Sequence, residues 1–103
     1  MLPKKERLQR LDFKDLRPRI FFRGTYVDIS ANTSKETKFT CIIQKKRIKK
    51  AVDRNSVRRK IYSIIQTIRP KKPYFIIMYP KQNVRTSNYS QIMTEIKSAF
   101  DTL

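Results

Sequence analysis

The sequence of 103 residues contains no histidine, and it has one glycine, one cysteine and eight acidic residues. Without histidine, the commonest general base and the commonest neutral metal ligand are missing, and nucleophilic triads that use histidine are excluded. The single glycine, Gly24, rules out a Gly-rich loop that cradles a nucleotide phosphate. The one close pair of carboxylates, Asp12 and Asp15, is interpreted as capping the start of a helix. The chain taken alone is therefore a poor candidate for a catalyst or a stand-alone nuclease.

Long apolar runs are also missing. The longest, residues 74–79, has the length of a strand and falls well short of the roughly 18 residues that cross a bilayer. Residues 1–7 are basic, but the apolar stretch of a secretory signal does not follow them. We therefore expect no membrane span and a cytoplasmic location. Cys41 cannot form an intrachain disulfide, and its apolar surroundings predict a small buried side chain.

Positive charge is what the sequence has in abundance: 25 Lys and Arg residues give a formal net charge of +17. Such a charge opposes compact folding by self-repulsion, which favours a polyanionic partner. Nucleic acid fits this requirement, because each neutralised phosphate releases a counterion. An anionic membrane surface is the alternative, but it calls for one amphipathic helix with a basic face, whereas these basic residues are spread over several predicted elements. A ribosomal-type surface fits the composition equally well.

Apolar periodicity predicts one domain, residues 1–103, with helices and strands in the order α-β-β-β-α-β-α. The expected elements are a short helix at 12–17, a broken strand or two short strands at 19–30, a polar turn at 31–36, a strand at 38–44, the longest helix at 51–68, a strand at 74–79, a loop at 80–88 and a helix at 89–102. A few strands covered by helices indicate a two-layer α/β sandwich of the α+β class.

Side-chain spacing also predicts which residues are buried. Phe39, Cys41 and Ile43 alternate onto one face of their strand. In the longest helix, an apolar stripe recurs at spacings of three and four, with the basic residues and Tyr62 on its flank. The stripe consists of Val57, Ile61, Ile64, Ile65 and Ile68. The last helix is expected to bury Tyr89, Ile92, Met93, Ile96, Phe100 and Leu103.

The densest basic feature is the segment from Lys45 to Lys60, in which nine of sixteen residues are basic and one is acidic. It covers the turn before the longest helix and the first turns of that helix, where free N–H groups add positive potential. Arginine binds phosphate bidentately, and asparagine offers a donor and an acceptor to a base edge or a 2′-hydroxyl. The segment predicts a phosphate-binding ridge, and spacing alone leaves DNA and RNA both open.

Residues 51–59, with the sequence AVDRNSVRR, are preceded by a basic turn at residues 46–48, with the sequence KRI. Together they resemble the signature of the bacterial ribonuclease P protein subunit, in which A-V-x-R-N-x-x-[KR]-R opens a long helix. The N-terminal stretch from Leu2 to Phe13 and the order of elements are similar as well, so the resemblance covers nearly the whole chain.

The resemblance implies a four-stranded sheet with a left-handed β-α-β crossover, although handedness statistics alone favour the right-handed form. It also implies that the chain is the protein component of ribonuclease P, which binds the catalytic RNA subunit and the 5′ leader of precursor tRNA. The RNA and the substrate would hold the catalytic Mg²⁺, and no obligate protein partner is expected. The alternative is a structural, ribosomal-type RNA-binding protein without a processing role.

The resemblance assigns six residues to contact with the RNA subunit: Lys46, Arg47, Arg54, Asn55, Arg58 and Arg59. It assigns Phe13, Val52 and Tyr26 to the cleft that holds the leader, where aromatic stacking suits single-stranded RNA of any sequence. Ordinary core packing is the alternative for Phe13 and Tyr26. Residues 17–18 interrupt the helix where a second cleft aromatic is expected, and Phe21 or Phe22 is a candidate to replace it.

Overall fold

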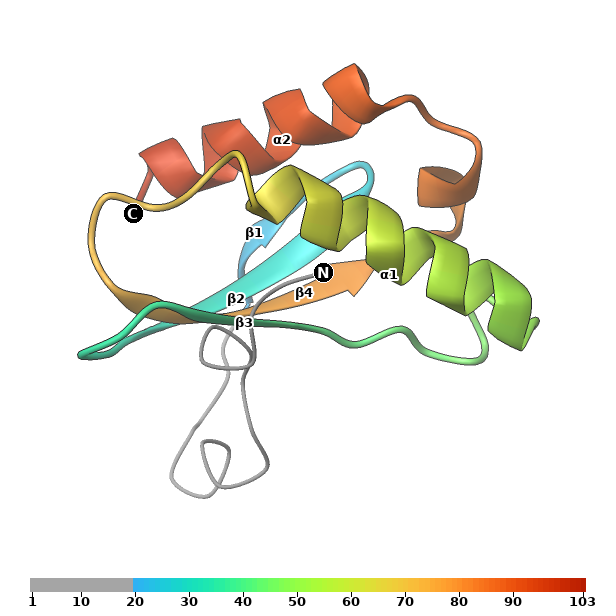
Figure 1. Cartoon of the computed structure of the whole chain (residues 1–103), viewed down its shortest axis with the longest axis horizontal. Helices are drawn as coiled ribbons and strands as arrows, with labels where there is room; N and C mark the ends of the chain where they lie inside the picture. The colour runs from blue at the N-terminus through green and yellow to red at the C-terminus, as the bar shows by residue number, and fades with distance from the viewer. Residues whose placement is uncertain (1–19) are drawn as a thin grey trace.

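The computed structural model describes residues 20–103, which form a four-stranded mixed sheet with two helices on one face (Figure 1). The elements are β1 (Ile20–Arg23), β2 (Val27–Thr33), β3 (Lys38–Cys41), α1 (Ala51–Ile65), β4 (Tyr74–Pro80), the 3₁₀ helix η3 (Gln82–Arg85) and α2 (Tyr89–Asp101). This arrangement confirms the predicted α+β class and the order of the described elements. The helix expected at 12–17 lies outside the described residues.

The sheet has the strand order β1-β2-β4-β3, with β2 antiparallel to both of its neighbours and β3 parallel to β4. In Figure 1 the β3 edge of the sheet is nearest the viewer, and α1 returns above the sheet before the chain enters β4 behind β3. This path makes the β3-α1-β4 crossover left-handed, as the resemblance implied. The connection from β3 into α1 places the basic segment at one end of the sheet.

The hydrophobic core lies between the sheet and the two helices. Val27 and Ile29 of β2 face the core, and Ile29 pairs with Met78 of β4. Phe39 and Cys41 of β3 are buried on the same side, as their alternation predicted. The helices contribute Val57, Ile61, Ile64 and Ile65 from α1 and Ile92, Ile96, Ala99 and Phe100 from α2. The predicted apolar stripe is thus the inner face of α1 from Val57 to Ile65, and its last member, Ile68, follows the end of the helix.

Strand β2 is longer than expected and β3 is shorter. The polar turn was predicted to begin at Ala31, but β2 continues to Thr33 because residues 31–33 pair with the start of β4. Cross-strand pairing thus overrides the polar composition of this stretch. Strand β3 ends at Cys41 rather than at Gln44, and only the backbone N–H of Ile42 continues the ladder, to Met78 O.

Helix α1 ends at Ile65, three residues before the predicted end. The backbone N–H and the hydroxyl of Thr67 both donate to Ile64 O, at 3.0 and 2.8 Å, which tightens the last turn and closes the helix. Helix α2 begins at Tyr89 and is capped by Asn88, whose side chain accepts a hydrogen bond from the N–H of Gln91. Within residues 20–103, neither helix nor any other helical segment is long and apolar enough to cross a membrane.

Two tyrosines differ from their predicted exposure. Tyr89 was expected to be buried, but it is 47% exposed at the first position of α2, with its ring under the ammonium of Lys60. Tyr62 was placed on the flank of the apolar stripe, but it is 8% exposed and packs in the core. Its hydroxyl is hydrogen-bonded to the side chain of Thr40 and the backbone of Cys41. These bonds satisfy the polar end of the ring, so Tyr62 can be buried although it lies on the flank of the stripe.

Candidate RNA-binding site

The basic turn, residues 45–50, connects β3 to α1 and is fixed by its one apolar side chain. Ile48 is 1% exposed, and its backbone N–H donates to Gln44 O at 3.2 Å. With Ile48 held in the core, the lysines around it are directed outward: Lys46, Lys49 and Lys50 are all exposed. The turn therefore exposes several ammonium groups around one buried side chain, Ile48, that fixes its position.

Arg54 braces this turn from the first turn of α1. Its Nη1 donates to the carbonyl oxygens of Ile48 and Lys49, at 3.0 and 2.7 Å. Lys50, the N-cap residue, makes no side-chain capping bond. The guanidinium of Arg54 thus ties the turn to the helix and keeps positive charge at the helix start, where an anion is favoured.

Arg47 connects the turn to the sheet. Its guanidinium lies 3.6 Å from the carboxylate of Asp28, which is 3% exposed, and donates to Tyr79 O at 3.4 Å. Lys81 approaches the other carboxylate oxygen of Asp28 at 3.4 Å. The two cations compensate the charge of the buried carboxylate, which would otherwise be costly to remove from water. Asp28 therefore positions the side chain of Arg47 at the edge of the basic turn.

Further along α1, a groove of about 260 Å³ is lined by Asn55, Arg58, Arg59 and Tyr62. Asn55 and Arg59 are exposed, and Arg58 donates to Asn55 Oδ1 at 3.1 Å. Burial raises the pKa of the Tyr62 hydroxyl, and the positive charge of Arg58 opposes that rise. The groove offers donors and an amide on the outer side of the helix, and its one phenol stays neutral.

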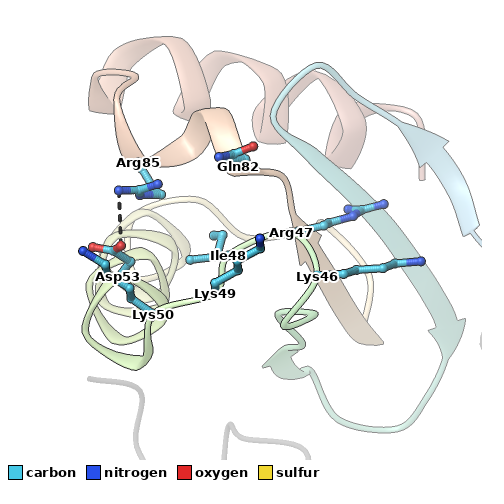
Figure 2. A pocket seen from close by; sticks show the side chains of 8 residues that line it. All are labelled: Lys46, Arg47, Ile48, Lys49, Lys50, Asp53, Gln82 and Arg85. Carbon is cyan, nitrogen blue, oxygen red and sulfur yellow. Dashed lines mark ion pairs between the residues drawn. The ribbon is translucent and has the colours of Figure 1, made fainter.

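The basic pocket is a cavity of about 410 Å³ between the basic turn, the start of α1 and η3 (Figure 2). Five of its eight lining residues are cationic and one is acidic. The lining is Lys46, Arg47, Ile48, Lys49, Lys50, Asp53, Gln82 and Arg85. The single carboxylate, Asp53, lies 3.2 Å from the guanidinium of Arg85. So concentrated a positive charge around an open cavity suits a phosphate group.

A family model described as Ribonuclease P matches residues 2–103. The chain belongs to the ribonuclease P protein family. Membership gives it the role of a protein component of ribonuclease P, in tRNA processing, and implies association with the RNA of that ribonucleoprotein. The ribosomal-type alternative is not favoured.

Solved structures of ribonuclease P proteins share the fold. A Staphylococcus aureus ribonuclease P protein, a mutant with defective mRNA degradation activity, is 17% identical with a TM-score of 0.78, over 96% of this chain and 88% of that chain. The ribonuclease P protein from Thermotoga maritima is 16% identical with a TM-score of 0.74, over 95% and 97% of the two chains. No match is found among curated protein sequences.

The six ribonuclease P signature residues fall on two surfaces. Lys46 and Arg47 line the basic pocket, and Asn55, Arg58 and Arg59 line the groove on α1. Arg54 lies between these surfaces and is partly engaged with the turn. The assignment of these residues to RNA contact stays a prediction.

The residues predicted for the leader cleft are less closely grouped. Val52 is 77% exposed on the first turn of α1, whereas Tyr26 is half-buried against the core in the β1–β2 connection. Phe13 lies outside the described residues. Of the two candidate replacement aromatics, Phe22 packs against the core and Phe21 is 39% exposed. The leader-cleft assignment stays a prediction, and exposure favours Phe21 over Phe22.

Sequence reasoning missed the wall of the basic pocket that η3 provides. Gln82 and Arg85 come from the stretch predicted as a loop, and no spacing or motif in that stretch signals their approach to the basic turn. For metal ligands, the described part of the chain has no group of three or more His, Cys, Asp or Glu side chains placed to hold an ion.

Proposed function

We propose that the chain binds the catalytic RNA subunit of ribonuclease P through the basic turn and the outer side of α1. The observation that carries the proposal is the basic pocket, where five cationic side chains meet one carboxylate beside a helix start. Asn55, Arg58 and Arg59 add a second polar surface, the groove further along α1. A folded RNA matches such a surface, because its closely spaced phosphates need cations at several neighbouring points.

In this proposal the RNA performs the endonucleolytic step that removes the 5′ leader of precursor tRNA, and this chain is its protein subunit. The catalytic Mg²⁺ ions belong to the RNA and the substrate. The chain acts in the cytoplasm and needs no other protein. Phe13, Tyr26 and Val52 are proposed to contact the leader, and exposed Phe21 offers a further aromatic surface for stacking.

The first test is the affinity of the reconstituted ribonucleoprotein for precursor tRNA and for mature tRNA at moderate salt. Because the chain is proposed to contact the leader, adding it to the RNA subunit should strengthen binding of precursor tRNA more than binding of mature tRNA. Equal strengthening of both would contradict leader recognition. Cleavage of precursor tRNA by rigorously RNA-free protein would contradict catalysis by the RNA.

The RNA-binding surface is tested by charge reversal. Arg58→Glu should weaken assembly with the RNA subunit by at least about tenfold, because it removes a cation and adds an anion beside the RNA phosphates. The matched control is Lys97→Glu, an exposed reversal on α2. Circular dichroism establishes that both variants are folded. Wild-type assembly by Arg58→Glu would remove α1 from the interface.

The ribosomal-type alternative is tested by the RNA that co-purifies with the chain. Sequencing this RNA should recover the ribonuclease P RNA, because membership of the ribonuclease P protein family implies association with that RNA. Predominant recovery of ribosomal RNA would favour the alternative.

A further inference from the structure

The 3₁₀ helix η3 presents two polar side chains to the basic pocket. In a 3₁₀ helix, residues three apart lie above one another, so Gln82 and Arg85 share one side of η3. Val84 is 0% exposed and anchors the opposite side in the core. Figure 2 shows Gln82 and Arg85 across the pocket from the basic turn. The register of η3 therefore directs a guanidinium and an amide into the cavity.

Lys60 fixes η3 against α1. Its ammonium donates to the carbonyl oxygen of Val84 at 3.0 Å and to that of Ser87, at the end of the same loop. It also lies 5.6 Å from the ring centroid of Tyr89. Because α1 starts at the pocket and Lys60 ties α1 to η3, the two walls are held in a fixed relation. The pocket is thus built before any ligand arrives.

The described part of the chain neutralises the positive charges of the pocket only in part. Arg85 is paired with Asp53 at 3.2 Å, and Arg47 is paired with Asp28. Within residues 20–103, no ion pair is recorded for the three exposed lysines of the pocket, Lys46, Lys49 and Lys50. A guanidinium has five N–H donors, so the pair with Asp53 orients Arg85 and leaves donors for a second anion.

We propose that Arg85 and Gln82 form a second protein wall of the RNA interface, and that one backbone phosphate of the RNA binds between η3 and the basic turn. The inference rests on the proposed function, and it extends the interface beyond the signature residues to a segment that carries no motif. Asp53 is a positioning residue, since it holds the guanidinium of Arg85 toward the cavity. The phosphate supplies an anionic partner to the three lysines of the pocket, which form no ion pair within residues 20–103.

The experiment compares Arg85→Ala with Lys97→Ala, which removes the same charge from an exposed site on α2. Affinity for the ribonuclease P RNA is measured over a range of salt concentrations. Arg85→Ala should lower affinity about tenfold and make the slope of log K against log salt shallower by about 0.7 to 0.9, the value of one phosphate contact. Arg85→Lys should keep the slope and lose part of the affinity, because an ammonium cannot bind phosphate bidentately.

An Arg85→Ala variant with the affinity and slope of Lys97→Ala would overturn the inference. If Arg58→Glu still weakens assembly in that case, the proposed function stands without the second wall. If the wild-type chain does not bind the ribonuclease P RNA, the proposed function itself fails.

A second measurement locates the RNA directly. Cys41 is buried, so Gln82→Cys introduces the only accessible thiol among the described residues, to which a hydroxyl-radical source is attached. We expect cleavage of the bound RNA at one cluster of nucleotides, and no such cluster from the control Ser98→Cys on α2. Equal cleavage patterns from the two tethers would place the RNA away from η3.

Discussion

Glu95 of α2 holds the connection between β1 and β2 through its carboxylate. The carboxylate accepts the backbone N–H groups of three successive residues: Thr25, Tyr26 at 2.8 Å and Val27 at 3.0 Å. Successive N–H groups that converge on one anion form a nest, a favourable site for negative charge. Here a side chain of the same protein occupies it. We predict that Glu95→Ala destabilises the fold strongly, although Glu95 lies outside the hydrophobic core.

The magnitude follows from the burial of the three bonds. The bond from Thr25 is exposed and contributes little, whereas those from Tyr26 and Val27 are partly buried. Counting each of these two at the lower end for bonds to charged groups, the loss is about 3 kcal/mol. For a domain of this size, such a loss lowers the Tm by roughly 12 to 24 °C. The assay is urea unfolding followed by circular dichroism, with exposed Ser98→Ala as the control.

Gly24 gives this reasoning an internal check. A Cβ on Gly24 would lie 2.5 Å from Cδ of Glu95 and 2.6 Å from the backbone oxygen of Val27. Gly24→Ala should therefore destabilise the wild type by about 1 to 3 kcal/mol, as overpacking does. In the Glu95→Ala background one of the two clashes is absent, so the double variant should lose less than the sum of the single losses. The account would be refuted if Glu95→Ala lowered the free energy of unfolding by less than about 1 kcal/mol, or if the losses of the two single variants added strictly in the double variant.

Two further predictions concern Arg54 and Cys41. Arg54→Ala removes the donor to two carbonyl oxygens of the basic turn. Amide hydrogen exchange in residues 45–50 should therefore accelerate, and affinity for the RNA subunit should fall about tenfold. Arg54→Lys should restore only part of the protection from exchange and only part of the affinity. Unchanged exchange would show that Arg54 does not brace the turn. Burial raises the pKa of the Cys41 thiol to about 12, so the native chain should resist iodoacetamide near about pH 8, while the urea-unfolded chain reacts. The raised pKa favours the folded state only while the thiol is protonated, so this contribution to stability is complete below the unfolded pKa of 9.0 and is lost as pH rises toward about 12. Equal alkylation of native and unfolded protein would contradict the burial of the thiol.

Elements with a strong side-chain period were predictable from the sequence. The alternation through Phe39 and Cys41 identified the inner face of β3, and the stripe from Val57 to Ile65 identified the inner face of α1. Both patterns work because burial on one side repeats with the geometry of the backbone. The concentration of positive charge at the start of the longest helix was predictable because its residues are adjacent in the sequence, whereas their assignment to RNA contact stays a prediction.

Features that depend on contacts between distant segments were not predictable in this way. Residues 31–33 are polar, yet they become strand because β4 pairs with them. Arg85 reaches the basic pocket because Val84 and Lys60 fix η3 against α1, and nothing in the local sequence encodes that approach. The left-handed crossover runs against general handedness statistics, so only the family resemblance anticipated it.

The placement of the acidic side chains explains how so basic a chain keeps both a fold and a binding surface. Among the described residues, Asp28 pairs with Arg47 and Lys81, Asp53 pairs with Arg85, and Glu95 holds a backbone nest. Asp28 and Asp53 hold Arg47 and Arg85 of the basic pocket, whereas Lys46, Lys49 and Lys50 form no ion pair with any of the described residues. Self-repulsion among those lysines opposes folding of the free chain, and an RNA phosphate would relieve it. Binding of the RNA should therefore stabilise the chain against unfolding by mass action and also by removing this repulsion.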